Sequence, residues 1–217
     1  MNDTRLVQPE ILDSLPEEAP AARRSRRDLR VLNRLLGNET WFRDVLAGRR
    51  RPDDRILEVG AGEGTLARAL MKAGLGPVAG LDLARRPADW PVQAPWFQTS
   101  VFEFVSWTDY SVVMGNLVFH HFKADELAEI GAQLGRRARL IVLSEPLRSR
   151  RSAWLFSLVC PLIKADPVTR HDGRVSIEAG FRGDELPALL KLDPKQWSWR
   201  ITHTVFGSYR LVAERRA

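Results

Sequence analysis

The stretch Ile56–Leu57–Glu58–Val59–Gly60–Ala61–Gly62–Glu63–Gly64–Thr65 decides the fold. Its first four residues, Ile56–Val59, predict a short strand, and an amphipathic helical pattern follows from Thr65 to Ala73. Three closely spaced glycines join the two. Because glycine has no Cβ, such a turn lets the backbone approach a bound ligand closely. The stretch therefore predicts the start of a βαβ unit, with a ligand crevice at the carboxyl end of its first strand.

The spacing of the glycines and the next acidic residue indicate the kind of ligand. The pattern is GxGxG, whereas the dinucleotide fingerprint GxGxxG would place its third glycine where Thr65 stands, which disfavours a nicotinamide dehydrogenase. Asp82 lies at the end of the next predicted strand, Val78–Leu83. An acid in that place can accept hydrogen bonds from both hydroxyl groups of a ribose. The two features together predict a nucleoside site.

The rest of the chain continues the alternation of strands and helices. This alternation predicts an α/β fold with a Rossmann-like doubly wound sheet, and two alternating segments near the end predict a C-terminal antiparallel hairpin. The further strands are expected at Ser111–Met114, Leu140–Leu143, Trp197–Thr204 and Ser208–Glu214, and the further helices at Asp125–Leu134 and Gly183–Leu190.

The N-terminal part has a different composition. Residues 1–22 are rich in proline, glutamate and alanine, which predicts a loosely ordered arm ahead of a single domain over 23–217. A helical cap is expected over 23–50. Its first helix would begin at the capping-box-like pair Ser25 and Asp28 and end at Gly37, and a second would cover Trp41–Leu46.

An insert over residues 151–182 separates the predicted strand Leu140–Leu143 from the last helix. It is too apolar for an ordinary surface helix and too short to cross a bilayer. We predict that it covers the active site as a substrate lid, with plain core packing and a dimer surface as the alternatives. Its apolar residues are Trp154, Leu155, Phe156, Leu158, Val159, Cys160, Leu162 and Ile163.

Composition sets broad limits. The sequence has one cysteine, Cys160, and neither a signal-like N-terminus nor an apolar run of membrane-spanning length, so a cytoplasmic location is expected. The formal net charge of +6 comes mainly from arginine clusters. These clusters fit a solvated surface, and an acidic substrate, acidic partner or peripheral membrane contact is the alternative. Either a monomer or a homodimer is compatible with these features.

The motifs Glu58-x-Gly60-x-Gly62-x-Gly64 and Gly80–Leu81–Asp82–Leu83 resemble the signature of class I S-adenosyl-L-methionine (SAM)-dependent methyltransferases, over roughly residues 54–145. The resemblance implies SAM as cofactor, bound over the carboxyl ends of the first strands, and a sheet with one antiparallel strand. Carried over by position, the cofactor-binding residues would be Glu58, Gly60, Ala61, Gly62, Gly64, Asp82, Leu83, Ser100, Val101 and Asn116.

The resemblance also implies roles for these positions. Glu58 and the glycine loop would hold the methionine portion, Asp82 the ribose, and Leu83 would lie beside the adenine. Ser100 stands where the family usually has an acid that contacts the adenine amino group. The sequence departs from the family here, but the serine hydroxyl could still make this contact. Asn116 would contact the amino-acid moiety of SAM.

Candidates for acid–base chemistry follow the fourth predicted strand, in Gly115–Phe122. The His-His pair there is similar to that of ubiquinone- and menaquinone-type and aromatic natural-product methyltransferases. A neutral imidazole can take a proton from a phenol, whose pKa is near 10. His121 is therefore predicted to be the base or to orient the substrate, with packing behind the loop as the alternative, and His120 is predicted to be structural.

Two further residues are catalytic candidates. Glu145 follows a strand at the face that lines the crevice, so it would meet substrate or else pair with an arginine. His171, next to Asp172, is assigned to the pocket. No metal site is predicted. The sequence thus predicts a methyltransferase acting on oxygen or carbon of a hydrophobic small molecule, with a nucleic-acid methyltransferase, considered unlikely, and a non-catalytic SAM-binding protein as alternatives.

Overall fold

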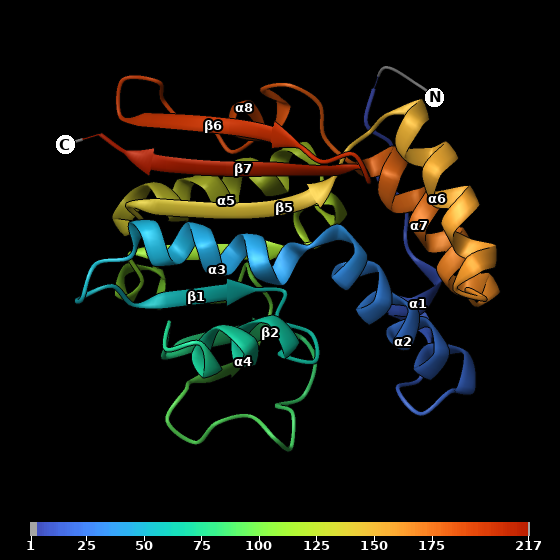
Figure 1. Ribbon diagram of the computed structural model, residues 1–217. Helices are drawn as coiled ribbons and strands as arrows, with labels where there is room; N and C mark the ends of the chain where they lie inside the picture. Colours follow the sequence, from blue (N-terminus) through green and yellow to red (C-terminus); the bar gives the residue numbers. More distant parts are fainter. Residues whose placement is uncertain (1–3, 217) are drawn as a thin grey trace.

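The computed structural model describes residues 4–216, and a mixed sheet forms the centre of that part of the chain (Figure 1). The strand order is β3-β2-β1-β4-β5-β7-β6, and β7 runs antiparallel to both of its neighbours. The predicted α/β class and the C-terminal hairpin are therefore confirmed. The strands are β1 (Ile56–Val59), β2 (Val78–Asp82), β3 (Trp96–Gln98), β4 (Val112–Asn116), β5 (Leu140–Pro146), β6 (Trp197–His203) and β7 (Ser208–Arg215).

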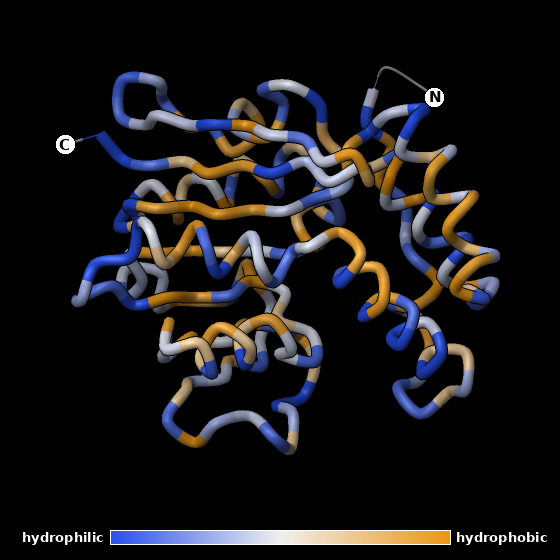
Figure 2. Tube along the Cα trace, in the orientation of Figure 1, coloured by the Kyte–Doolittle hydropathy of each residue, from blue (hydrophilic) through white to orange (hydrophobic). Residues whose placement is uncertain are grey.

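Helices cover both faces of this sheet. Along β5, Leu140 and Val142 join the core cluster that includes Phe42 of α3, while Ile141 and Leu143 join the one that includes Leu127 of α5. This alternation explains why β5 is apolar throughout (Figure 2). The helices are α1 (Ile11–Ser14), α2 (Pro20–Leu36), α3 (Asn38–Arg49), α4 (Thr65–Lys72), α5 (Ala124–Arg137), α6 (Arg150–Leu162), α7 (Pro167–Ala179) and α8 (Glu185–Leu189), with 3₁₀ turns η1 (Trp107–Asp109) and η2 (Phe119–His121).

A group of helices lies beyond the carboxyl ends of the parallel strands. Figure 1 shows α1, α2, α6 and α7 gathered there, and α7 contacts each of the other three. The strand ends are where ligands bind in open α/β sheets. The N-terminal helices and the predicted insert therefore meet over the predicted crevice, although they are far apart in the sequence.

Helix α2 begins earlier than the sequence predicted. Its first residue is Pro20 and its N-cap is Ala19, so Ser25 and Asp28 lie inside the helix rather than at a capping box. Both are buried and contact Thr169 of α7, whose Oγ1 lies 3.1 Å from Ser25 Oγ and 3.0 Å from Asp28 Oδ2. Ser25 and Asp28, predicted to cap the helix, thus form a tertiary contact with α7 instead. The predicted end of the helix at Gly37 is confirmed, with φ of 67°.

Strand β3 was not predicted. It has only three residues, Trp96–Gln98, lies at the edge of the sheet and pairs in parallel with β2. Three residues give too short an alternation for a periodic signal. The strand extends the sheet beside Asp82, since Asp82 pairs with Gln98.

The insert forms the two helices α6 and α7. Helix α6 leaves Trp154, Leu158 and Leu162 exposed, at helical spacing, while Cys160 is buried. Within residues 4–216, the helices lack the combined length and apolar content that a bilayer span requires. The insert is thus packed against the domain through α7, with one apolar stripe of α6 facing outward.

Candidate cofactor and active site

The glycine loop has the backbone conformation that its sequence requires. Gly60, Gly62 and Gly64 have φ values of 67°, 54° and 67°, a region that side chains disfavour. A Cβ on Gly60 would lie 2.4 Å from Val118 Cγ2, so the loop packs closely against the segment after β4. A Cβ on Gly62 would meet no atom within 4 Å. Gly62 therefore borders open space at the end of β1, between Gly60 and the helix α4.

Asp82, at the end of β2, is bonded to this loop. Its Oδ2 accepts a hydrogen bond from Gly62 N at 2.7 Å, and its Oδ1 accepts one from Ala84 N at 2.8 Å. Leu83, next to it, has 74% of its surface exposed, which is unusual for a leucine. The structure thus brings the predicted ribose-binding acid and the predicted adenine contact to the rim of the loop.

Glu58 lies beneath the loop. Its carboxylate is buried and accepts a hydrogen bond from Ala67 N, in the first turn of α4, at 3.1 Å. Burial, opposed by the bond from Ala67 and aided by the nearby charge of Asp82, raises the pKa of Glu58 to about 8. Glu58 thus ties β1 to the start of α4 and is largely protonated at neutral pH.

The remaining cofactor candidates differ in their surroundings. Ser100 Oγ accepts a weak hydrogen bond from Phe102 N at 3.3 Å, and Val101 packs against the core cluster of α5. Both lie in the segment that follows β3, the edge strand beside β2. Ser100 and Val101 therefore belong to the side of the crevice where the resemblance places the adenine.

Asn116, at the end of β4, is part of an asparagine network that sequence reasoning missed. Its Oδ1 accepts a hydrogen bond from Asn38 Nδ2 at 2.8 Å, and its Nδ2 donates one to Asn33 Oδ1 at 2.9 Å. Asn38 Oδ1 in turn accepts a bond from Ser144 Oγ at 3.0 Å. The network fastens α2 and α3 to the ends of β4 and β5, so both ends of the Asn116 amide are already used.

Glu145 organises the loop after β4 from behind. It is fully buried, and its carboxylate accepts hydrogen bonds from the backbone N–H groups of Val118, Phe119 and His120 at 3.1, 2.9 and 3.2 Å. Leu117, just before this turn, has a strained φ of 58°. The geometry gives Glu145 a positioning role, while the predicted contact with substrate or pairing with an arginine remains a prediction.

The two histidines of η2 meet carboxylates from the N-terminal segment. His120 Nε2 lies 3.4 Å and His121 Nε2 3.9 Å from Glu10 Oε1, and His121 Nδ1 lies 3.5 Å from Asp13 Oδ2. The opposite nitrogen of His120, Nδ1, bonds to Glu145 at 2.7 Å. Residues 10–13, predicted to be part of a loosely ordered arm, thus lie against the predicted catalytic motif.

The electrostatics of the two histidines differ. Burial opposes the charged form of His120, but hydrogen bonds and charge from Glu10 and Glu145 outweigh it and raise its pKa to about 9. Burial and the neighbouring His120 charge lower the pKa of His121, against the attraction of Glu10 and Asp13. His120 is therefore an imidazolium held between two carboxylates, while His121 favours its neutral form.

His171 is not part of this cluster of side chains. It lies on α7, half exposed, and its Nδ1 bonds to Asp172 at 2.9 Å. Asp172 uses its two oxygens to accept hydrogen bonds from Ile11 N and Leu12 N, both at 2.9 Å, at the start of α1. The predicted assignment of His171 to the pocket remains a prediction, whereas Asp172 clearly fastens the N-terminal segment.

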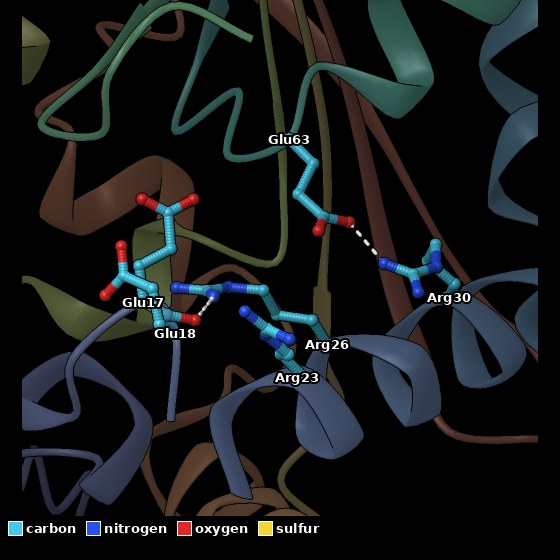
Figure 3. Close-up of a pocket in the computed structure, with 6 residues that line it drawn as sticks. All are labelled: Glu17, Glu18, Arg23, Arg26, Arg30 and Glu63. Carbon is cyan, nitrogen blue, oxygen red and sulfur yellow. Dashed lines mark hydrogen bonds and ion pairs between the residues drawn. The ribbon is translucent and has the colours of Figure 1, made fainter. Parts of the chain in front are cut away.

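A cavity of about 460 Å³ opens between α2 and the tip of the glycine loop (Figure 3). Arg30 Nη1 lies 2.6 Å from Glu63 Oε2, and Arg26 donates a hydrogen bond to Glu17 O at 2.9 Å. Part of the basic charge of α2 is thus neutralised within the molecule. The residues that line the cavity are all charged: Glu17, Glu18, Arg23, Arg26, Arg30 and Glu63.

No protein-family model matches the sequence, and no curated protein matches it either. Solved structures do match. The plantazolicin methyltransferase BpumL in complex with SAH superposes with a TM-score of 0.70 at 14% identity, covering 92% of each chain. The fold is that of the class I SAM-dependent methyltransferases. This likeness confirms the fold that the glycine loop and the reversed strand β7 predicted.

Two other methyltransferase structures agree. The magnesium protoporphyrin IX methyltransferase from Synechocystis PCC 6803 with bound SAM has a TM-score of 0.56 at 16% identity, over 89% of this chain and 84% of that one. The methyltransferase domain of bacterial CtHen1 has a TM-score of 0.60 at 18% identity, over 83% and 99%. At these identities the likeness establishes the methyltransferase fold.

Proposed function

We propose that the protein is a SAM-dependent methyltransferase that methylates an oxygen or carbon atom of a hydrophobic small molecule of aromatic, quinone-like or polyketide-like character. The observation that carries the proposal is the glycine loop with Asp82 bonded to it, on a methyltransferase fold. The similar BpumL structure, with SAH bound, and the similar magnesium protoporphyrin IX methyltransferase structure, with SAM bound, support the choice of cofactor.

The residues present fit an adenosyl group. The space beside Gly62 would be filled by any side chain at that position, and Asp82 is held at the edge of the same space. The two carboxylate oxygens of Asp82 now accept hydrogen bonds from backbone N–H groups. When a ribose binds, they can accept hydrogen bonds from its two hydroxyl groups instead. The exposed side chain of Leu83 offers an apolar surface to an adenine ring.

The chain's own residues would position the acceptor. When bound, SAM supplies a methyl group on a sulfonium, a good leaving group, so the protein must mainly align the nucleophile and exclude water. His121 lies in the loop packed against Gly60, through Val118, and has a side chain 29% exposed. We assign His121 to orienting the acceptor, with Asp13 facing its Nδ1 atom.

Aromatic side chains beside this loop support an apolar acceptor. Phe122 directly follows η2, and its ring lies 5.8 Å from that of Phe102, edge to face. Phe102 is partly exposed and follows the predicted adenine segment. Such a pair offers an apolar surface on which a planar ring can pack. The charged cavity of Figure 3 is unsuited to an apolar group, so we place the acceptor on the Phe122 side of the loop.

A methyl-transfer assay tests the proposal. The protein is incubated with SAM carrying a labelled methyl group and with a panel of phenols, quinols and polyketides, and separately with total RNA, and products are detected by mass spectrometry. We expect label in at least one hydrophobic acceptor, and none with the Asp82→Ala variant. Label found only in RNA would support the nucleic-acid alternative, and tight SAM binding without turnover on any acceptor would support a non-catalytic SAM-binding protein.

A further inference from the structure

Three ligating side chains converge where the N-terminal segment meets η2. One atom each of Glu10, His120 and His121 can be chosen so that all three lie within 4.8 Å of one another. The His120 side chain is 96% buried, and its Nε2 atom, which faces Glu10, has no hydrogen-bond partner in the structure. Glu10 Oε1 faces this atom at 3.4 Å without hydrogen-bond geometry, so a metal ion bound between the two atoms would take the place of the imidazolium proton.

Both histidines are arranged as metal ligands commonly are. His120 presents Nδ1 to the carboxylate of Glu145, 2.7 Å away, and Nε2 to Glu10. His121 presents Nδ1 to Asp13, 3.5 Å away, and Nε2 to Glu10 as well. In metal sites a carboxylate on the far nitrogen fixes the ring and leaves the near nitrogen free to bind the ion. Here the arrangement occurs twice around one point.

The supporting structure holds these groups in place. Glu145 bonds to three successive backbone N–H groups of the turn that carries both histidines. Glu10 is bonded to Ser176 of α7, and Asp172 fixes the residues that follow it. The three candidate ligands thus come from two segments that are each anchored independently.

We propose that Glu10, His120 and His121 bind a divalent transition-metal ion, with Zn²⁺ as the reference ion. Two imidazole nitrogens and one carboxylate oxygen suit Zn²⁺, Fe²⁺, Co²⁺ and Ni²⁺ rather than Mg²⁺ or Ca²⁺, which prefer all-oxygen sites. This replaces the sequence-based prediction that the protein has no metal site. Sequence reasoning missed it because Glu10 lies 110 residues from His120 (120 − 10) and only the fold brings them together.

Binding requires a modest contraction of the cluster. Ligands about 2.1 Å from a tetrahedral ion lie about 3.4 Å apart, so a pair at the 4.8 Å limit must close by about 1.4 Å (4.8 − 3.4). Three protein ligands leave at least one coordination position open. If the proposed function is right, that position is beside the residue assigned to the acceptor, and an acceptor heteroatom would bind there as a ligand. The metal site itself does not depend on methyl transfer.

The test measures metal binding alone, without SAM or acceptor. Tag-free protein is stripped with chelator and titrated with Zn²⁺ by calorimetry, and then with Co²⁺, whose visible absorption reports the ligand set. We expect one ion per chain and a Co²⁺ spectrum typical of nitrogen and oxygen ligation. Absence of binding, or binding without the Co²⁺ spectrum, overturns the proposal and leaves the cluster as an imidazolium between carboxylates.

Variants locate the ion. Glu10→Gln and His121→Asn are chosen because neither is in the deeply buried position of His120, and each should weaken Zn²⁺ binding by at least about 100-fold. Asp13→Asn, behind His121, should weaken it by about 10–100-fold. His203→Ala, on the terminal hairpin, is the matched control and should leave it unchanged. Equal affinity in Glu10→Gln and wild type would overturn the assignment even if an ion binds elsewhere.

The assay also separates this proposal from the proposed function. Zn²⁺ bound at the predicted residues, with no methyl transfer to any acceptor, would support the metal site and contradict the function. If the metal-stripped protein fails to bind Zn²⁺ and still transfers methyl groups, the proposed function would be supported and the metal site contradicted.

Discussion

Single residues carry the chemistry of this site mostly as carboxylates held by backbone N–H groups. Asp82, Glu58 and Glu145 each sit at or near the end of a parallel strand, and each accepts a hydrogen bond from the backbone of the turn or helix after β1 or β4. An acid in that place fixes the shape of the neighbouring segment.

Glu58 gives a pH-dependent contribution to stability. Its pKa, about 8 in the folded state against 4.5 for an unperturbed group, is raised, so the protonated form favours folding. That contribution is full below pH 4.5 and is lost as the pH rises through 8, by at most about 5 kcal/mol. We expect Glu58→Gln to flatten the fall in unfolding free energy between about pH 4.5 and 8, measured by urea denaturation. An unchanged pH slope in the variant would contradict this.

His121 is expected to affect turnover more than cofactor binding. On an acceptor identified in the methyl-transfer assay, His121→Ala should lower kcat/KM by about 100-fold, in the range typical of lost acid–base or orienting groups. The SAM Kd should stay within about twofold. His203→Ala is the control. A His121→Ala enzyme with wild-type kcat/KM would remove His121 from the active site.

Elements far apart in the sequence are fastened over the crevice by single buried acids. Asp28 of α2 accepts a hydrogen bond from Asp166 N at 2.7 Å and another from Thr169 Oγ1, so it joins α2 to the start of α7. Asp172 of α7 joins that helix to α1 in the same way. Asp28 and Asp172 therefore each join an N-terminal helix to α7.

The contact between α2 and α7 predicts a measurable loss of stability. Asp28→Ala would leave the Asp166 amide buried without a partner and should lower the unfolding free energy by about 3 kcal/mol. Arg27 pairs with Asp28 but is half exposed, so Arg27→Ala should cost less than about 1 kcal/mol. Chemical denaturation of both variants checks the difference, and equal losses would contradict the role given to Asp28.

The contact between α7 and α1 predicts a local effect instead. Asp172→Ala removes the acceptor for Ile11 N and Leu12 N, and hydrogen exchange at these amides should rise by about 10–100-fold. Amides of β5 serve as an internal control and should be unaffected. Exchange at Ile11 and Leu12 that stays at the wild-type rate would show that other contacts hold α1.

On the scale of the whole molecule, the strands other than β3 and the helices α4, α5 and α8 were predictable, whereas the start of α2 and the docking of the N-terminal segment were not. The bounds of β1, Ile56–Val59, agree with the prediction because glycines follow directly after four buried residues. The predicted start of α2 was wrong because Ser25 and Asp28 do not cap α2. They form hydrogen bonds with α7 and its N-cap Asp166, more than 130 residues away in the sequence (166 − 28 = 138).

The same difference between local and long-range contacts separates the predictable part of the candidate site from the rest. The glycine loop follows β1 and Asp82 ends β2, and these strands are consecutive in the sequence and adjacent in the sheet. Their proximity could therefore be predicted from the sequence. Glu10, Asp13 and Asn38 reach the site only through tertiary packing, and a proline- and glutamate-rich N-terminus carries no periodic signal of where it docks. Contacts of that kind require the structure.

Calorimetric titration of SAM into the purified protein tests the central claim most directly. We expect one SAM per chain for the wild type, and for Gly48→Val, a control in which the same side chain points into open space on α3. Gly62→Val and Asp82→Ala should show no measurable binding, because one fills the space beside the loop and the other removes the ribose acceptor. Wild-type affinity in Gly62→Val and Asp82→Ala, or no SAM binding by the wild type, would contradict the account.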